Sequence, residues 1–547
     1  MNRSLLLLTT TLLALAPAGF PPGARADDTT TVRISSASKS APHLEAGEAA
    51  SDGSVDEGGQ HIDYRAIAGT LVVHPKGWDD AAKNSGSADG DKPADDANPT
   101  AEASMFYVAY FRKGAKAENR PITFLYNGGP GSATVWLHMG ALGPRRVITL
   151  DHSHGPAAPY QLVNNDQSLM DASDLVFIDA PGTGFSRIAG KDKEKNFYGV
   201  DQDAHAFEEF ITTFLSKYGR WNSPKYLFGE SYGTTRSAVL VNALEQDANV
   251  DVNGVILLSQ ILNFDISADG PQANPGVDLP YIAALPTYAA TAWYHHKLPD
   301  NPPDLHALLA EVEQFAATEY AAALQQGSLL DHDHLEAVAQ KLNRYTGLPV
   351  AYLEKANLRV DGGMFEKTLL SGDTDITGRF DTRFSGPAMD PLAKEAEYDP
   401  QSSAISSAYV SAFNDYVRRQ LGYGGTKSYK PEIEVDNWDM KHLQPNTTQP
   451  STGSLNVMPD LAAAMVYNPN LKVQLNQGYY DLATPYFGGE YEMHHLPMPQ
   501  ALQANIEFRH YESGHMVYAH PDSLKQLHDN VADFIRRTEG GRPTTAK

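Results

Sequence analysis

The sequence predicts an α/β fold, in which helices cover both faces of a mostly parallel sheet and a largely helical cap is inserted into the sheet domain. The first observation is a series of short, nearly continuous apolar runs, each next to a helix-like stretch, at 121–126, 175–178, 226–228 and 254–258. Such runs are typical of strands buried in a parallel sheet. The second observation is that this alternation stops between about 266 and 455, where proline-rich turns separate long helical stretches.

The first 26 residues are expected to be an export signal. Met1–Arg3 is basic, residues 5–18 are apolar, and Ala24-Arg25-Ala26 matches an A-x-A cleavage site. The apolar stretch is too short for a bilayer span, and no later segment approaches about 18 continuous apolar residues. We therefore expect an exported protein, periplasmic or extracellular, without a membrane span once the signal is removed. A retained N-terminal anchor is the alternative.

Residues 27–60 are rich in Ser, Ala, Gly and acidic residues, and we expect a flexible leader there. The first part of the sheet domain, 61–265, begins with a predicted hairpin. Its strands are Tyr64–His74 and Met105–Arg112, and the low-complexity stretch Asp79–Ala103 is expected to be the loop between them.

The remaining predicted elements alternate as the fold requires. In the first part of the sheet domain, helices are expected at 206–218 and 234–244. Residues 266–455 are interpreted as the cap, above the carboxyl ends of the strands, where open α/β sheets bind ligands. The second part of the sheet domain, 456–541, is expected to contain helices at 460–467 and 522–537 and strands at 471–475 and 504–508.

Composition excludes several kinds of partner and site. The chain has 43 Lys and Arg residues against 67 Asp and Glu residues, a formal net charge of −24. This negative field repels nucleic acid and anionic membranes. The chain has no cysteine, so it forms no disulfides. A metal would need histidines and carboxylates, but no metalloprotease spacing such as H-E-x-x-H occurs. We expect no metal and no other cofactor.

A nucleophile elbow is predicted at Gly229-Glu230-Ser231-Tyr232-Gly233, a G-x-S-x-G pattern. In such an elbow the serine occupies a sharp strand-to-helix turn, and glycines avoid a clash with it. The flanks agree, because an apolar run precedes the pattern and a helix-like stretch follows it. A buried serine in an ordinary turn is the alternative.

A nucleophilic serine needs a base that a third group orients. In this type of fold the acid follows the serine in the chain, and the histidine comes last. Asp481 follows the predicted strand 471–475, and His515 follows the strand 504–508 after a glycine. His510 is the rival base, and Asp460 and Glu512 are weaker rivals for the acid.

An oxyanion hole needs backbone N–H groups aimed at the developing charge. One is expected from Tyr232, the residue after the serine. The other is expected from the glycine-rich turn Asn127-Gly-Gly-Pro-Gly131, which follows an early strand.

Together these segments resemble the serine carboxypeptidase family over about 120–520. The matching stretches are LYNGGPGSA at 125–133, LGP at 142–144, DLVFIDAPGTGFS at 174–186, GESYG at 229–233, NQGYYDLATP at 476–485 and GHM at 514–516. The combination of NGGPGS, PGTGFS and GESYG is specific, whereas each one alone is not.

The resemblance implies an α/β-hydrolase core with an inserted cap, and removal of C-terminal residues from peptide substrates. Carried over by position, it implies a role for each of seven residues: Ser231 as nucleophile, Asp481 as orienting acid, His515 as base, Gly129 and Tyr232 as oxyanion amides, and Asn127 and Glu230 as ligands of the substrate's terminal carboxylate.

The chain departs from the family in two respects. Eukaryotic members carry disulfides, whereas this chain has no cysteine and is expected to have an export signal. In these two features the chain is similar to a bacterial envelope branch of the family. Many members also have a second glutamate two residues before the Gly-Pro at 143–144, where this chain has Ala141. Arg145 and Arg146 are candidates for replacing this glutamate, by bidentate pairing with the substrate carboxylate. The alternative is that both are surface charges.

The leading hypothesis is therefore a secreted serine-type carboxypeptidase that acts through an acyl-enzyme. An esterase or acyltransferase on the same scaffold is the alternative, because a triad and an oxyanion hole serve any acyl transfer. A binding protein without catalysis is a further alternative, against which the presence of all three triad residues argues.

Overall fold

A ten-stranded sheet forms the centre of the computed structural model, which describes residues 44–79, 98–300 and 302–540. The strands, including two short pairs outside the large sheet, are β1 (Glu48–Glu57), β2 (Gln60–Val73), β3 (Glu102–Arg112), β4 (Ile122–Tyr126), β5 (Arg145–Val147), β6 (Leu162–Asn164), β7 (Asp174–Ile178), β8 (Arg187–Ala189), β9 (Lys225–Glu230), β10 (Gly254–Leu258), β11 (Asp375–Thr377), β12 (Ser385–Pro387), β13 (Lys472–Gly478) and β14 (Ile506–Tyr511).

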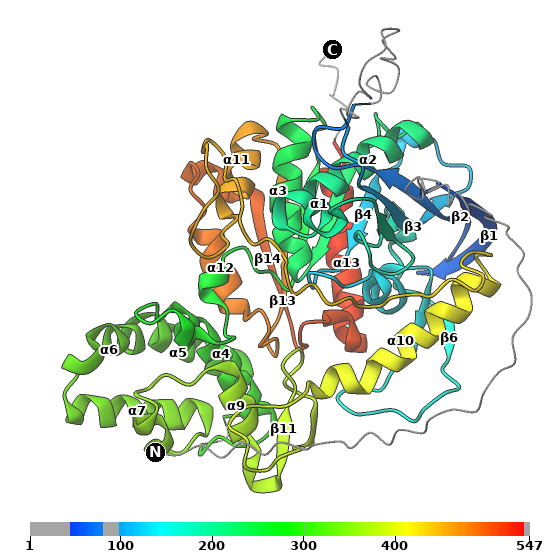
Figure 1. Ribbon diagram of the computed structural model, residues 1–547. Coiled ribbons are helices and arrows are strands. Elements are labelled where there is room, and N and C mark those ends of the chain that lie inside the picture. The colour runs from blue at the N-terminus through cyan, green and yellow to red at the C-terminus, as the bar shows by residue number, and fades with distance from the viewer. Residues whose placement is uncertain (1–43, 80–97, 301, 541–547) are drawn as a thin grey trace, which may run out of the picture. The chain divides into compact units, whose positions relative to one another are not determined.

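The helices connect and cover these strands (Figure 1). They are α1 (Lys193–Phe197), α2 (Val200–Tyr218), α3 (Tyr232–Gln246), α4 (Leu279–Tyr294), α5 (Leu305–Phe315), α6 (Ala321–Gln326), α7 (His332–Thr346), α8 (Val350–Lys355), α9 (Gly362–Leu369), α10 (Pro400–Arg419), α11 (Met458–Tyr467), α12 (Tyr486–His494) and α13 (Pro521–Thr538).

The sheet is parallel over its larger part. The strand order is β1-β2-β3-β7-β4-β9-β10-β13-β14, with β8 paired to β3. From β7 to β14 every neighbouring pair is parallel, whereas β1, β2 and β3 form an antiparallel edge that joins β7. The predicted α/β class is confirmed, and so is the hairpin of β2 and β3. The export signal at 1–26 and most of the loop expected at 79–103 lie outside the described residues.

The expectation of a flexible leader at 27–60 is wrong for the last part of that stretch. Residues 48–57 form β1, which pairs with β2 from Glu48 opposite Gly69 to Glu57 opposite Gln60. The strand is mostly exposed or half-buried, and only Val55 and Glu57 are buried. Its order therefore comes chiefly from backbone pairing at the sheet edge, which an acidic, serine-rich composition does not reveal.

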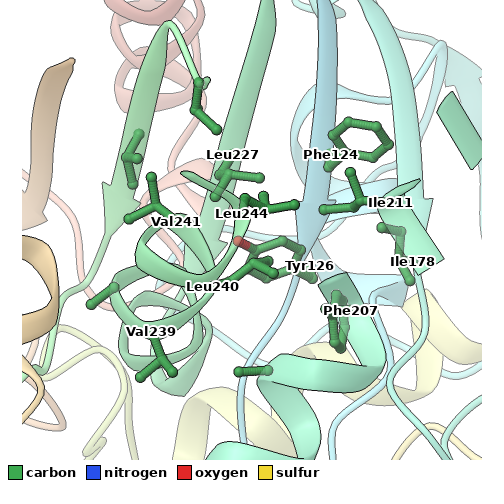
Figure 2. Packing of buried hydrophobic residues seen from close by; sticks show 14 of the residues in the cluster. Phe124, Tyr126, Ile178, Phe207, Ile211, Leu227, Val239, Leu240, Val241 and Leu244 are labelled. Carbon is green, nitrogen blue, oxygen red and sulfur yellow. The ribbon is translucent and has the colours of Figure 1, made fainter. Parts of the chain in front are cut away.

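Helices cover both faces of the sheet, and alternate strand residues point to opposite layers. On one face, Phe124, Leu227 and Val255 pack in a cluster with residues of α2, α3 and α11. Figure 2 shows Phe124, Tyr126 and Leu227 close to the side chains of α2 and α3. On the other face, Leu125 and Phe228 pack with residues of α10 and α13. This alternation follows from the two-residue period of a strand.

The block expected as a single cap at 266–455 has two halves that pack differently. Helices α4 to α9 share a hydrophobic cluster of their own, to which Tyr480, Leu482 and Tyr486 also belong. Helix α10, by contrast, buries Tyr409 and Phe413 in a cluster of the large sheet. The apolar face of α10 thus completes a sheet layer, so only the first half of the block is an independent helical layer. In the described ranges, no helix is both long and apolar enough to cross a membrane.

Candidate active site

Ser231 occupies the sharp turn between β9 and α3. Its backbone has φ 60° and ψ −131°, a strained conformation for a residue with a side chain. The two glycines of the pattern are required by close packing. A Cβ atom at Gly229 would lie 2.2 Å from the carbonyl oxygen of Gly233, and one at Gly233 would lie 2.9 Å from the carbonyl oxygen of Tyr126. Larger residues would therefore displace the backbone of the turn.

The glycine-rich turn after β4 abuts the elbow. A Cβ atom at Gly128 would lie 2.4 Å from the backbone nitrogen of Tyr232, so only glycine allows this approach. Neither Gly129 nor Tyr232 donates its backbone N–H to another group in the part of the chain that the structure describes, and both residues line the same cavity. Two available N–H groups beside a serine are what an oxyanion hole requires.

A buried arginine, which sequence reasoning missed, joins this turn to the elbow helix. Arg236 of α3 donates to the carbonyl oxygen of Asn127 at 2.8 Å and pairs with Asp203 of α2 at 2.6 Å. Both charged side chains are almost completely buried. Arg236 thus joins the turn to α2 and α3. Removing either member of the ion pair would leave a buried charge unpaired, so the arginine is held firmly in place.

Asp481 and His515 are hydrogen-bonded to each other. Asp481 Oδ2 lies 2.8 Å from His515 Nδ1, and both side chains are buried. The carboxylate also accepts from Thr484, at 2.9 Å from its backbone nitrogen and at 2.7 Å from its hydroxyl. Burial lowers the pKa of His515, but the charge of Asp481 and its hydrogen bond outweigh burial, so the pKa lies above its ordinary value. This is the pairing that orients a catalytic base.

The inserted block braces the turn that carries His515. The backbone N–H of His515 donates to the carbonyl oxygen of Phe380 at 2.6 Å, and Gly514 donates to Asp381 at 3.2 Å. A Cβ atom at Gly514 would lie 2.4 Å from that same carbonyl oxygen. Gly514 is therefore required by a close approach between segments far apart in the sequence.

The rival residues have other partners. His510 lies in β14, 3.1 Å from Glu490, and stacks on Tyr479. Asp460 lies 2.8 Å from Nε2 of His442. Glu512 is exposed and lies 3.7 Å from His306. None of the three rivals is among the described residues that line the cavity at Ser231.

A cavity of about 510 Å³ opens at the carboxyl ends of the parallel strands. Residues of the predicted site that line it are Asn127, Gly129, Glu230, Ser231, Tyr232 and His515. Asp481 is fully buried behind His515 and does not line it. Six of the seven predicted residues therefore line one cavity, and the seventh, Asp481, is hydrogen-bonded to His515.

Glu230 is a buried carboxyl group beside the serine. Tyr518 donates to both of its oxygens, at 2.9 and 3.1 Å. A further hydrogen bond comes from Asn127, whose own amide oxygen accepts from the backbone of Leu137 at 3.1 Å. Burial raises the pKa of Glu230 to about 7, although the charge of His515 and these hydrogen bonds oppose the rise. This carboxyl group therefore changes charge near neutral pH.

Sequence reasoning missed Tyr518 and an ion pair in the cavity. Arg379 and Asp269 both line the cavity, and their side chains form a two-bond ion pair, one bond being 2.9 Å. Ala141, fully buried, supplies no polar side chain, and neither Arg145 nor Arg146 is among the cavity's lining residues. No local pattern marks Tyr518, since its partner lies 288 positions earlier.

Within the described residues, no group of three or more histidines, aspartates or glutamates gathers in a way that could hold a metal ion.

The sequence of this chain is similar to the sequences of known proteins. A family model described as serine carboxypeptidase matches residues 96–520. A serine carboxypeptidase-like protein of Oryza sativa subsp. japonica is 30% identical over 138 residues, which cover 24% of this chain and 29% of the relative. A pheromone-processing carboxypeptidase of Yarrowia lipolytica is 28% identical over 145 residues, which cover 26% of this chain and 22% of the relative. The chain thus matches less than a third of the length of these two relatives.

Among solved structures, a proline iminopeptidase of Mycobacterium smegmatis matches 89% of this chain and 99% of its own, with 12% identity and a TM-score of 0.31. A thermophilic esterase of Thermogutta terrifontis matches 80% of this chain and 95% of its own, with 11% identity and a TM-score of 0.29. The family match at 96–520 contains the glycine-rich turn, the elbow and the Asp481–His515 pair, and on this basis the chain belongs to the serine carboxypeptidase family.

Proposed function

We propose that this protein is an exported serine-type carboxypeptidase, which removes C-terminal residues from peptides through an acyl-enzyme on Ser231. The observation that carries the proposal is the position of Glu230. A buried carboxyl group with a pKa near 7 lines the cavity directly beside the nucleophile. In its protonated form it is a hydrogen-bond donor for a carboxylate, which is the group that distinguishes a free peptide end.

In the proposed reaction, Ser231 Oγ attacks the carbonyl carbon of the last peptide bond while His515 accepts the serine proton. Asp481 stabilises the imidazolium that forms. The backbone N–H groups of Gly129 and Tyr232 stabilise the negative oxygen of the tetrahedral intermediate. His515 then gives the proton to the leaving amine, and the C-terminal amino acid departs. Water, activated by the same histidine, hydrolyses the acyl-enzyme and regenerates the serine.

Carboxylate recognition is assigned to Glu230 and Asn127. Asn127 accepts from the backbone of Leu137, so its amide nitrogen remains as the donor. A substrate carboxylate next to an ionised Glu230 would be repelled, so binding requires the proton on Glu230. Free-acid peptides are therefore expected to bind best below the pKa of Glu230.

Export is part of the proposal and is supported by the signal-like pattern at residues 1–26. Fractionation of the producing cells, with N-terminal sequencing of the mature chain, tests it. Cleavage after Ala26 is the expected result, and an intact N-terminus in the cytoplasmic fraction would contradict export.

The activity is tested with matched peptides that end in a free acid or in an amide. The ratio of their kcat/KM values cancels the titration of His515, which affects both substrates alike. The kcat/KM of the acid peptide divided by that of the amide should fall by about tenfold per pH unit above a pKa of about 7. Glu230→Gln should make this ratio independent of pH.

Glu432→Gln is the matched control. Glu432 is an exposed carboxylate that lines the same cavity, so the variant makes the same chemical change away from the buried position. It should leave the pH profile of the ratio unchanged. A ratio that is independent of pH in the unmodified protein would show that Glu230 does not read a terminal carboxylate. Mass spectrometry of a digested peptide mixture gives the direct check, because a carboxypeptidase removes residues from one end only.

A further inference from the structure

We propose that Tyr518 is a positioning residue of this active site, which acts through Glu230 on recognition of the substrate's terminal carboxylate. The inference rests on the proposed function and extends it to a residue outside the cavity. Tyr518 is 3% exposed and is not among the cavity's lining residues, whereas Glu230 is 2% exposed and lines the cavity. The tyrosine thus holds the glutamate from the buried side and does not itself contact substrate.

The contact is a forked hydrogen bond. The Tyr518 hydroxyl lies 2.9 Å from Oε2 and 3.1 Å from Oε1 of Glu230. A hydroxyl has one hydrogen to donate, so it can serve either carboxyl oxygen while the other oxygen carries the proton. Tyr518 therefore satisfies Glu230 in both of its charge states, and in the protonated state the glutamate's own proton remains available to the cavity.

Two loops build both halves of the site. The elbow carries Ser231 next to Glu230, and the turn after β14 carries His515 three positions before Tyr518. That turn is fixed to another segment where His515 donates to the carbonyl oxygen of Phe380, and it is closed internally where Ala519 donates to the carbonyl oxygen of Met516 at 2.7 Å. The Tyr518–Glu230 bond joins the two loops directly, so the recognition group is held in register with the catalytic base.

The turn that carries Tyr518 packs against a buried segment. The buried π-helical segment Leu137–Leu142, which contains Ala141, is in contact with the turn Val517–Ala519 that carries Tyr518. Ala141 has no polar side chain, whereas the phenol of Tyr518 donates to Glu230. Unlike a second carboxyl group, a buried phenol stays neutral over the working pH range, because burial keeps the pKa of Tyr518 well above its ordinary value.

The charge of Glu230 depends on every group that faces it. Burial favours its neutral form, and so does the negative charge of Asp481. The positive charge of His515 favours its ionised form, and so do the hydrogen bonds from Tyr518 and Asn127. Tyr409, from α10, is close enough to feel the charge of Glu230, but no hydrogen bond joins the two in the described structure. Removing the Tyr518 hydroxyl should therefore raise the pKa of Glu230.

The test uses the acid and amide peptides described above with Tyr518→Phe. A hydrogen bond to a charged group contributes about 1.5 kcal/mol, so the pH at which the acid-to-amide ratio falls should rise by about one unit. Turnover of the amide should stay within about twofold at each pH. Tyr409→Phe is the matched control, since it removes the hydroxyl of another buried tyrosine near Glu230. Its profile should match that of the unmodified protein.

A fluorinated tyrosine placed at position 518 alone provides a variant that keeps the hydroxyl and the packing. Its more acidic hydroxyl is a stronger donor, so the transition should move to lower pH, opposite to the phenylalanine variant. If neither variant moves the transition, or if acid and amide lose activity equally, Tyr518 only supports the fold and the inference fails. If instead the unmodified protein shows no pH-dependent ratio, or Glu230→Gln retains it, the proposed function itself has failed.

Discussion

Replacing His442 by glutamine should remove a buried cation that fastens the extended segment 420–457 to the sheet domain. His442 Nδ1 lies 2.5 Å from Asp201 of α2, and Nε2 lies 2.8 Å from Asp460 of α11. The histidine is 2% exposed. The same segment packs Trp438 edge-on against Tyr232, with 5.5 Å between ring centroids. The imidazolium thus joins two helices and a segment that contacts the expected oxyanion residue.

The magnitude follows from the pKa of His442. Burial lowers this pKa, but the hydrogen bonds and charges of Asp201 and Asp460 raise it from 6.5 to about 9. A difference of about 2.5 units corresponds to about 3 kcal/mol, and screening of the 42% exposed Asp201 side chain reduces this to about 2 kcal/mol. Because the folded-state pKa is the higher one, this stabilisation is present in full below pH 6.5 and is lost as pH rises through 9.

The assay is urea unfolding followed by circular dichroism, at about pH 6 and about pH 9.5. His442→Gln should lower the free energy of unfolding by about 2 kcal/mol more at the lower pH than at the higher one. The control is His295→Gln: burial lowers the pKa of His295, so its cost should not shrink as pH rises. An equal loss at both pH values for His442→Gln would refute a charged His442 in the folded protein.

Three further predictions concern the elbow and the base. Ser231→Ala should lower kcat by roughly 10⁴- to 10⁶-fold with the fold intact, and a serine-directed organophosphonate should label Ser231 in the unmodified protein; labelling of another serine instead would reject this nucleophile. His515→Ala should be nearly as damaging, whereas His510→Ala should retain most activity, and the reverse order in a kcat comparison would mean that His510 is the base. Gly229→Ala places a Cβ atom 2.2 Å from the carbonyl oxygen of Gly233, so it should cost about 3 kcal/mol of stability by thermal unfolding and slow organophosphonate labelling; a fold and labelling rate like those of the unmodified protein would show that the turn is not tightly packed.

Much of the site could be predicted from the sequence because its signals are local. The elbow is five consecutive residues between a strand and a helix, and the turn at Asn127 follows directly on β4. The positions of Asp481 and His515 could be predicted because each follows a parallel strand, and the carboxyl ends of parallel strands meet at one edge of the sheet. Strand and helix patterns alone thus predict that four separate loops lie at the same edge of the sheet.

The features that the sequence did not reveal all depend on contacts between distant segments. Strand β1 is acidic and has little apolar signal, so its order depends on pairing with β2. Helix α10 has an apolar face, but nothing in its own sequence tells whether that face meets the helical cluster of α4 to α9 or the large sheet. Patterns of two and 3.6 residues identify an element and its buried face, and they do not identify what covers that face.

The sequence by itself determined the fold class, the elbow and the three residues expected to carry catalysis, because short-range spacing encodes strand, turn and helix. Tertiary structure alone decided how Glu230 is held. Its donor Tyr518 lies 288 positions away and bears no motif of its own. Burial raises the pKa of Glu230 to about 7 only once the elbow, the turn at Asn127 and the turn after β14 have come together. A pKa is a property of the assembled surroundings, since desolvation and nearby charges exist only after the chain has folded.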